Sequence, residues 1–142
     1  MKTIKFSVLL FLLSLLLTAC PKPKTEAVTP NGMVGTWAGK YSNSPTDFLN
    51  LDFVLDLKAD GSLKTYNAKS IAVANAGQIG EGTYTVSKDG LSITANYQYK
   101  SNPTKYTLEL TTTKNYLQLL GTWLADGKLG GNMSINKFEI LK

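Results

Sequence analysis

Apolar and polar residues alternate over residues 48–59, and this pattern constrains the fold more than any other feature of the chain. Leu49, Leu51, Phe53, Leu55 and Leu57 fall on one parity, and the residues between them are mostly polar. Because successive side chains of a strand point to opposite sides of a sheet, a period of two predicts a strand with one buried and one hydrated face. Asp60-Gly61, directly after it, predicts a hairpin turn.

The same combination of alternating segment and turn recurs along the rest of the chain. Further turns are predicted at Asp89-Gly90, Ser101-Asn102-Pro103, Lys114-Asn115 and Asp126-Gly127. Further strands are expected near residues 34–42, 63–66, 82–87, 91–99, 105–112, 116–125 and 131–141. Regular short strands indicate an all-β barrel or sandwich, and sequential hairpins favour a meander. We therefore expect a single antiparallel up-and-down β-barrel of about eight strands, because closure removes the exposed edges.

Two segments leave alternatives open. Residues 67–79 are compatible with a continued strand, a short helix or a lid loop, and we favour strand or loop. In the last strand, Phe138 and Ile140 fall on the opposite parity from the inward Met133 and Ile135. This change of parity predicts either a β-bulge near Asn136 or an outward apolar patch.

The N-terminus has the organisation of a secretory signal. Lys2 and Lys5 precede an apolar run over residues 6–17, which is shorter than the roughly 20 residues of a membrane span. The following Leu17-Thr18-Ala19-Cys20 resembles the bacterial lipobox. That resemblance implies cleavage before Cys20 and attachment of acyl chains to it, so that the mature protein is anchored to a membrane without crossing it.

This organisation divides the chain into three parts. Residues 1–19 are the expected lipoprotein signal peptide, residues 20–33 the lipidated N-terminus and a disordered linker, and residues 34–142 the barrel domain. Three prolines and mixed charge favour an extended linker that spans about 40 Å. We expect a bacterial cell-envelope location, at the periplasmic face or the cell surface. Pro21 occupies the place of an inner-membrane retention aspartate, which favours the outer membrane.

The composition excludes several classes of function. The chain has no histidine and no arginine, and Cys20 is its single cysteine. Histidine is the commonest general base and metal ligand, and arginine is the preferred partner of phosphates and bases. After Ala19 there are 13 lysines and 10 acidic residues, so the net charge is +3, and it is scattered along the sequence. We therefore expect no enzymatic activity, no cofactor, no metal and no nucleic-acid partner; the oligomeric state stays open.

Three aspartates are spaced so that a calcium site has to be considered. Asp52, Asp56 and Asp60 recur every fourth residue, so they would share one face of a strand. At about 3.3 Å per residue they spread over roughly 25 Å, which is too far for one ion. We interpret them as part of a hydrated face.

Both ends of the domain carry short motifs of a known family. Gly35-Thr36-Trp37 opens it, and Gly121-Thr122-Trp123 and the segment from Gly130 to Lys137 lie near its end. Over residues 34–142 this pattern resembles the lipocalin-like, calycin-type domains of small bacterial lipoproteins. The resemblance implies an eight-stranded barrel in which Lys137, in place of an arginine, packs as a structural cation over Trp37.

An eight-stranded barrel either packs solid or holds one small ligand, and the two interiors correspond to two different functions. The first is a barrel that binds a small hydrophobic or amphipathic ligand, with room left by Gly39, Gly82 and Ala95. The expected lining is aromatic and aliphatic: Trp37, Tyr41, Leu51, Phe53, Leu55, Tyr84, Ile93, Tyr97, Leu108 and Trp123. The alternative is a non-enzymatic module with a solid core that binds an envelope protein or a glycan. Its expected outer patch comprises Val54, Leu120, Leu124, Phe138 and Ile140.

Overall fold

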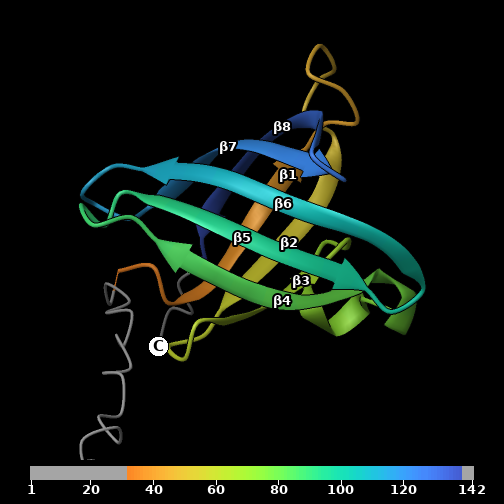
Figure 1. The fold of residues 1–142 in the computed structure, drawn as a ribbon, viewed down its shortest axis with the longest axis horizontal. Helices are drawn as coiled ribbons and strands as arrows, with labels where there is room; N and C mark the ends of the chain where they lie inside the picture. Colours follow the sequence, from red (N-terminus) through yellow and green to blue (C-terminus); the bar gives the residue numbers. More distant parts are fainter. Residues whose placement is uncertain (1–31, 139–142) are drawn as a thin grey trace, which may run out of the picture.

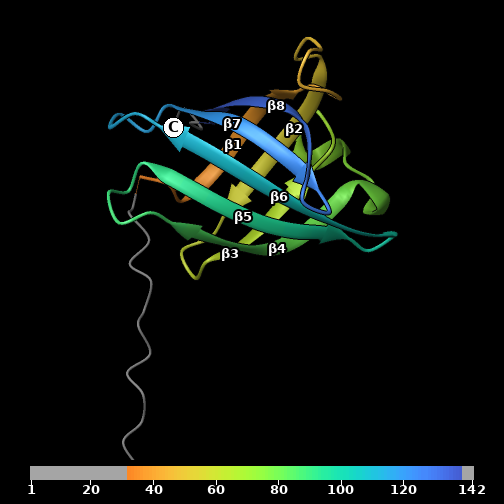
Figure 2. The ribbon, with the colours of Figure 1, turned by 45° about the horizontal axis from the view of Figure 1, so that its top comes forward.

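The computed structural model describes residues 32–138, and in it eight antiparallel strands form a closed barrel (Figures 1 and 2). Each strand pairs with the next along the chain, and β8 pairs with β1. The strands are β1 (Gly35–Tyr41), β2 (Leu51–Leu57), β3 (Ser62–Tyr66), β4 (Ile79–Val86), β5 (Ser92–Tyr99), β6 (Asn102–Thr112), β7 (Gln118–Ala125) and β8 (Lys128–Lys137). The all-β, up-and-down barrel predicted from the sequence is confirmed.

Some predicted features lie outside the described range. The signal peptide, the lipidation of Cys20, the linker up to residue 31 and the outward position of Ile140 all belong to this group. Within residues 32–138, no helix is long and apolar enough to cross a membrane.

Alternation along the strands fills the barrel interior. In β5 the buried residues Ile93, Ala95, Tyr97 and Tyr99 alternate with exposed polar residues, as the period of two predicts. In β6 Leu108 and Leu110 are buried on the same parity. Such side chains from all eight strands form one hydrophobic core.

The two ends of the barrel differ, and we name them by what they contain. At the plug end, where β1 begins and β8 ends, Met33 is fully buried and its carbonyl accepts a hydrogen bond from Trp37 Nε1 at 3.0 Å. There Lys137 Nζ donates to the Gly32 carbonyl at 2.6 Å. The opposite end is the mouth, which is bordered by the loops at residues 42–50, 67–78, 100–101 and 126–127. The segment before β1 therefore closes one end of the barrel only.

The predicted hairpin turns are largely as expected. Asp126 and Gly127 have φ values of 48° and 77°, the left-handed pair that a two-residue type I′ turn requires. Gly61 and Gly90 also have positive φ, at the plug end. The turn predicted at residues 101–103 is shorter than expected, because β6 already begins at Asn102.

Residues 67–78 form a loop, which is one of the two alternatives that we favoured, and not a continued strand. It contains two short 3₁₀ turns, η2 (Ile71–Val73) and η3 (Ala76–Gln78), and it lies beside the outer face of β1 and β2. Val54 of β2 points outward, yet it is only 2 % exposed, because this loop lies next to it. The prediction that Val54 belongs to an exposed patch is therefore wrong. Within that predicted patch Leu120 and Phe138 are exposed, whereas Leu124 is half-buried.

The β-bulge also lies at a different residue from the one predicted. Asn136 pairs regularly with Ala38 and Gln118. The register between β7 and β8 shifts instead at Gly130, because Trp123 pairs with Gly131 and Leu124 with Leu129. A side chain at Gly130 would meet the Trp123 ring at 2.2 Å, so the bulge residue has to be glycine. Phe138 extends past the end of β8 with its ring in solvent, which is the second of the two alternatives.

Candidate ligand-binding site

The structure divides the predicted lining residues into two groups along the barrel axis. Trp37, Leu55, Tyr84, Ile93 and Leu108 are buried in the plug half and the middle of the barrel. The other group lies toward the mouth and comprises Tyr41, Leu51, Phe53, Tyr97 and Trp123. Only the second group lies next to the open end, and none of its members lines the pocket found there.

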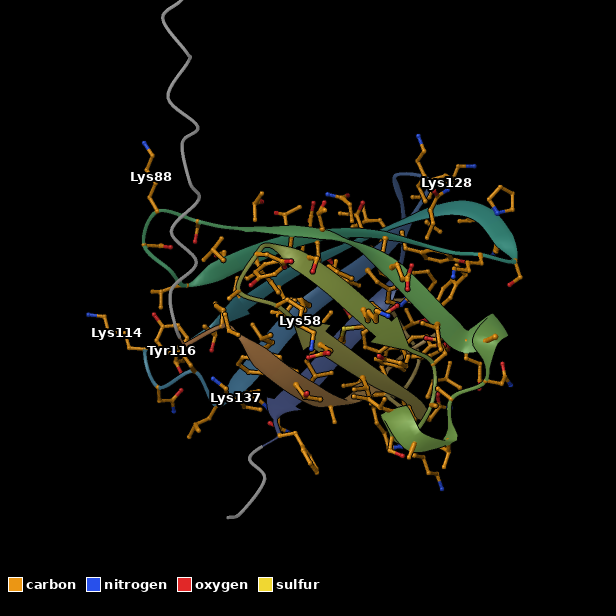
Figure 3. The ribbon with its side chains drawn as sticks, turned by 90° about the horizontal axis from the view of Figure 1, so that it is seen from below. Lys58, Lys88, Lys114, Tyr116, Lys128 and Lys137 are labelled. Carbon is orange, nitrogen blue, oxygen red and sulfur yellow. The ribbon has the colours of Figure 1, made fainter. Side chains whose placement is uncertain are left out.

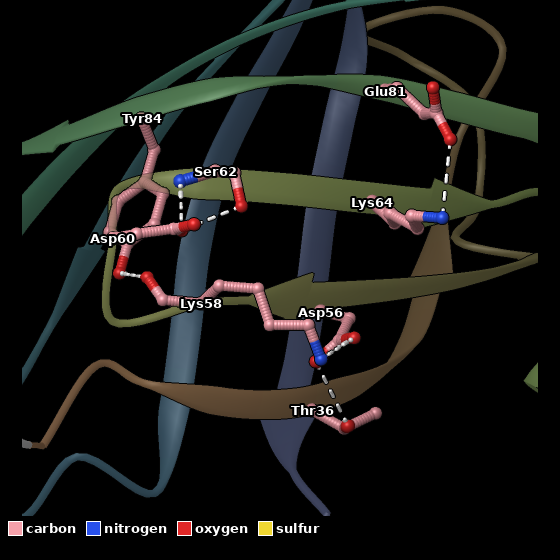
Figure 4. A network of polar contacts seen from close by, with 8 residues as sticks. All are labelled: Thr36, Asp56, Lys58, Asp60, Ser62, Lys64, Glu81 and Tyr84. Carbon is pink, nitrogen blue, oxygen red and sulfur yellow. Dashed lines mark hydrogen bonds and ion pairs between the residues drawn. The ribbon is translucent and has the colours of Figure 1, made fainter.

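Residues in the plug half hold the end of the barrel together. Lys137 Nζ lies 5.5 Å from the centroid of the Trp37 ring, in the arrangement that the resemblance to lipocalin-like domains implies. The Tyr84 hydroxyl donates to the Lys58 carbonyl at 2.7 Å and so ties β4 to the β2–β3 hairpin (Figure 4). Both contacts join groups of the protein itself and need no ligand.

The polar side chains on the outer face of that hairpin also have partners within the protein. Lys58 forms an ion pair with Asp56 at 2.7 Å, and Asp60 accepts hydrogen bonds from Ser62 (Figure 4). Asp52 pairs with Lys40 at 2.7 Å. Asp56 is only 8 % exposed, so the prediction of a hydrated face is wrong for this residue. The three aspartates have separate partners, and residues 32–138 contain no group of three potential metal ligands.

Six aromatic rings fill the barrel below the mouth, and we call them the mouth cluster: Tyr41, Phe53, Tyr97, Tyr99, Tyr106 and Trp123. Tyr97 and Tyr106 stack with centroids 5.3 Å apart and an interplanar angle of 18°. The other contacts are tilted or edge-to-face, at 5.4–6.4 Å. Aromatic pairs at these distances attract each other beyond their burial alone. The cluster forms a continuous aromatic floor for the mouth.

Loops attach to this floor through hydrogen bonds. Trp123 Nε1 donates to the carbonyl of Ser42 at 2.8 Å, which fixes the start of the 42–50 loop. The Tyr99 hydroxyl donates to Asn67 Oδ1 at 2.9 Å, and Asn102 Nδ2 donates to the Tyr106 hydroxyl at 3.1 Å. The polar ends of these two tyrosines therefore face the mouth, and their apolar rings face the core.

A pocket of about 200 Å³ opens at this position. Every residue that lines it is uncharged: Asn67, Gly77, Gln78, Tyr99, Ser101, Asn102 and Tyr106. No sequence pattern selects Asn67 or Gln78, because loop residues have no periodicity, and Asn102 is the first residue of β6, where the sequence predicts a turn. Their shared location depends on how the 67–78 loop folds onto the β5–β6 turn.

The glycines do not supply the room that we expected from them. A Cβ atom at Gly39 would lie 2.3 Å from the Ser134 carbonyl oxygen, and one at Gly82 would lie 1.9 Å from that of Asn96. The backbone of a neighbouring strand occupies both positions. Ala95 is itself fully buried in the core. These residues allow close strand approach, and the space for a ligand lies at the mouth.

A second hollow lies outside the barrel. It has a volume of about 250 Å³ and lies between β1, β2, the 67–78 loop and Phe138. Its lining is mostly apolar, with Ala38, Val54 and Ile71 among the contributors and Lys69 at its edge. It brings together two members of the predicted outer patch, Val54 and Phe138.

Burial raises the pKa values of three tyrosines in the mouth cluster. The pKa of Tyr97 lies well above its ordinary value of 10.0, first because of desolvation and then because of Tyr99. Desolvation likewise raises the pKa values of Tyr41 and Tyr99. The folded protein therefore holds these protons more tightly than the unfolded chain does.

We accordingly predict that the barrel loses stability in alkaline solution. Between pH 10 and the raised pKa values, the unfolded chain binds fewer protons than the folded one, so the free energy of unfolding falls as pH rises. Denaturant unfolding measured from pH 8 upward, together with tyrosinate absorbance, would show this. Tyr97→Phe should flatten the decline, and an unchanged slope in that variant would contradict the prediction.

No protein-family model matches the chain, and neither the curated proteins nor the solved structures contain a match to it. The described geometry therefore shows the barrel, and membership of the lipocalin-like family remains a proposal.

Proposed function

We propose that this protein is a bacterial lipoprotein of the lipocalin-like type, anchored to the outer membrane through acyl chains on Cys20. Its barrel binds a small hydrophobic or amphipathic ligand at the mouth. The proposal for Cys20 comes from the lipobox resemblance and the preceding apolar run. The proposal that the barrel binds a ligand is supported by the difference between its closed plug end and its open mouth.

One observation carries the ligand-binding part: the mouth cluster lies directly below an uncharged polar pocket. Small-molecule sites commonly combine apolar and aromatic walls with a few polar groups that orient the ligand. Here Tyr99 and Tyr106 contribute both, since their rings belong to the cluster and both residues line the pocket. The plug end has no such arrangement, because Met33 and Trp37 fill it.

The pocket also indicates which polar group it accepts. The amide groups of Asn67, Gln78 and Asn102 already form hydrogen bonds within the protein, but each keeps at least one further N–H to donate. No lysine or carboxylate lines the pocket. Burying a charge without a partner is costly, whereas an uncharged hydrogen-bonding group is matched here. We infer an amphiphile with an uncharged polar head.

A fluorescent binding assay tests this site. We expect a neutral naphthylamine probe to bind the purified protein and to be displaced by a monoacylglycerol better than by the fatty acid of the same chain length. Tyr106→Ala removes one ring of the floor and should weaken probe binding about tenfold, which corresponds to about 1.4 kcal/mol. Asn102→Ala should weaken the monoacylglycerol and leave the apolar probe unchanged.

Tyr84→Phe is the matched control, because it removes a tyrosine hydroxyl at the plug end without touching the mouth. It should bind both probes as the unmodified protein does. Binding that is insensitive to Tyr106→Ala and Asn102→Ala, or no binding at all, would rule out the mouth as the ligand site.

A further inference from the structure

Several large apolar side chains in solvent lie close to the mouth. Residues 32–138 contain eight exposed large hydrophobic residues, of which Phe48, Leu49 and Leu129 lie on mouth loops or next to them. Val73 belongs to the 67–78 loop, and Ile71 of the same loop lines the outer hollow beside Phe138. Leu117 and Phe138 lie at the plug end, and Leu120 lies on the outer face of β7. Exposed apolar groups that gather on one side of a protein indicate a surface that meets another apolar phase.

Hydrogen bonds fix the 42–50 loop so that its apolar tip lies away from the core. Ser42 is fully buried, and its hydroxyl accepts a hydrogen bond from the Asn132 backbone at 2.9 Å. Asn132 Nδ2 also donates to the Pro45 carbonyl at 2.9 Å. Phe48, beyond these bonds, is 91 % exposed, and the loop projects from the barrel in Figure 1. Because the Phe48 ring is almost fully in solvent, it contributes little to the stability of the fold.

The same bonds place the loop next to the β7–β8 hairpin. Asn132 belongs to β8, and Leu129, near the tip of that hairpin, is 53 % exposed. Phe48, Leu49 and Leu129 therefore come from neighbouring loops on one side of the mouth. We call these three residues the apolar rim.

Lysines without an ion-pair partner surround the mouth. Among the described residues, Lys100, Lys105 and Lys128 at the mouth form no salt bridge, and Asp47 and Asp126 are the acids on the mouth loops. At the plug end Lys88, Lys114 and Lys137 stand against Asp60 and Asp89. Figure 3 shows Lys128 on the opposite side of the barrel from Lys88 and Lys114. The mouth therefore presents three lysines without ion-pair partners at the same end of the barrel as the apolar rim.

We propose that the mouth end docks on an anionic lipid surface. The apolar rim enters the boundary between headgroups and acyl chains, and the three lysines contact anionic headgroups. This inference rests on the proposed function, to which it adds the source of the ligand: an amphiphile passes from the bilayer to the mouth without crossing water.

The anchoring distance is compatible with this orientation. Twelve residues separate Cys20 from Gly32, counting Gly32 itself, and a chain of that length reaches about 40 Å when extended. An eight-residue strand such as β5 spans about 27 Å. The segment before the plug end can thus reach along the barrel to a surface at the mouth.

A site-specific fluorophore tests the docking. The full protein, purified from bacterial membranes, receives one new cysteine, Thr46→Cys beside the apolar rim or Lys88→Cys at the plug end, and an environment-sensitive dye is attached. On vesicles of phosphatidylcholine and phosphatidylglycerol, the dye at position 46 should shift to the blue and be quenched by a lipid-borne quencher. The dye at position 88 should change little, and the shift at 46 should decrease without phosphatidylglycerol.

Two serine substitutions make the test specific. Phe48→Ser should remove the shift at position 46, whereas Leu117→Ser, at an exposed leucine of the plug end, should leave it intact. Equal signals at positions 46 and 88, or a shift that survives Phe48→Ser, would overturn the docking. So would a shift at 46 that follows protein concentration without vesicles, since it would assign the rim to a second copy of the chain.

The same samples separate this inference from the proposed anchor. If Cys20 carries lipid, each protein takes up one dye, and the protein floats with vesicles of either composition. Two dyes per protein would show a free Cys20 thiol and contradict the anchor, whatever the probe at position 46 reports.

Discussion

Gly82→Ala is expected to unfold the barrel or to leave it barely stable. The added Cβ would lie 1.9 Å from the Asn96 carbonyl oxygen and 2.7 Å from the Cα of Tyr97. Both contacts are with backbone, so no side chain can turn aside to relieve them. Gly82 pairs with Leu63 on one side and Tyr97 on the other, and moving it disrupts two ladders. We expect a loss of about 3–5 kcal/mol, a large part of the stability of an ordinary domain.

Circular dichroism and guanidinium unfolding would measure this loss. Gly77→Ala is the control, because its nearest contact is an ordinary 3.4 Å to Asn75 Oδ1 and its backbone N–H donor is kept. It should change the stability by less than about 1 kcal/mol. A Gly82→Ala protein as stable as the control would show that β4 and β5 do not approach so closely.

Trp37→Ala is expected to have the second largest effect. The indole is fully buried, and its removal leaves a cavity that costs about 3–5 kcal/mol. It also leaves the Met33 carbonyl without its donor and Lys137 without the ring beneath it. For a domain of this size the melting temperature should fall by roughly 20 °C.

Scanning calorimetry of Trp37→Ala, Trp37→Phe and Lys137→Met would separate the contributions of the indole ring, its Nε1 donor and the lysine to the stability. Trp37→Phe should recover part of the loss, because a ring remains but the Nε1 donor does not. Lys137→Met removes the cation and the bond to Gly32 while keeping most of the side-chain length, and should cost about 1–2 kcal/mol. If Trp37→Ala cost no more than Lys137→Met, the plug would not depend on the indole.

The strand pattern was predictable because it depends on local information. Alternation in β5 and β6 and the Asp-Gly turns specify which faces are apolar and where the chain reverses. Sequential hairpins then leave few topologies, of which a closed meander is the one without edges. Burial of the outward face was not predictable in the same way. Val54 has the parity of an exposed residue and is covered by a loop that follows the next strand.

The pocket at the mouth was not predictable for a related reason, since none of the ten residues expected to line the barrel lines this pocket. Parity identified the inward rings of Tyr41, Tyr97 and Trp123, but parity does not say which end of the barrel is closed. That depends on Met33, which lies in a segment whose composition predicts a linker. The inward glycines likewise suggested empty space, whereas adjacent strands fill it. Distances between strands follow from the shear of the whole barrel, which no single strand encodes.

The plug also determines how a mechanical load enters the molecule. A pull on the chain before Gly32 reaches the Lys137–Gly32 bond and the Trp37–Met33 bond before it reaches the ladder between β1 and β8. The first bond links the segment before β1 to the last residue of β8 at the plug end of the seam between these strands, so tension at the N-terminus is shared with β8 and does not act on β1 alone. A protein held by its N-terminal side would thus resist peeling at the very strand pair whose separation opens the barrel.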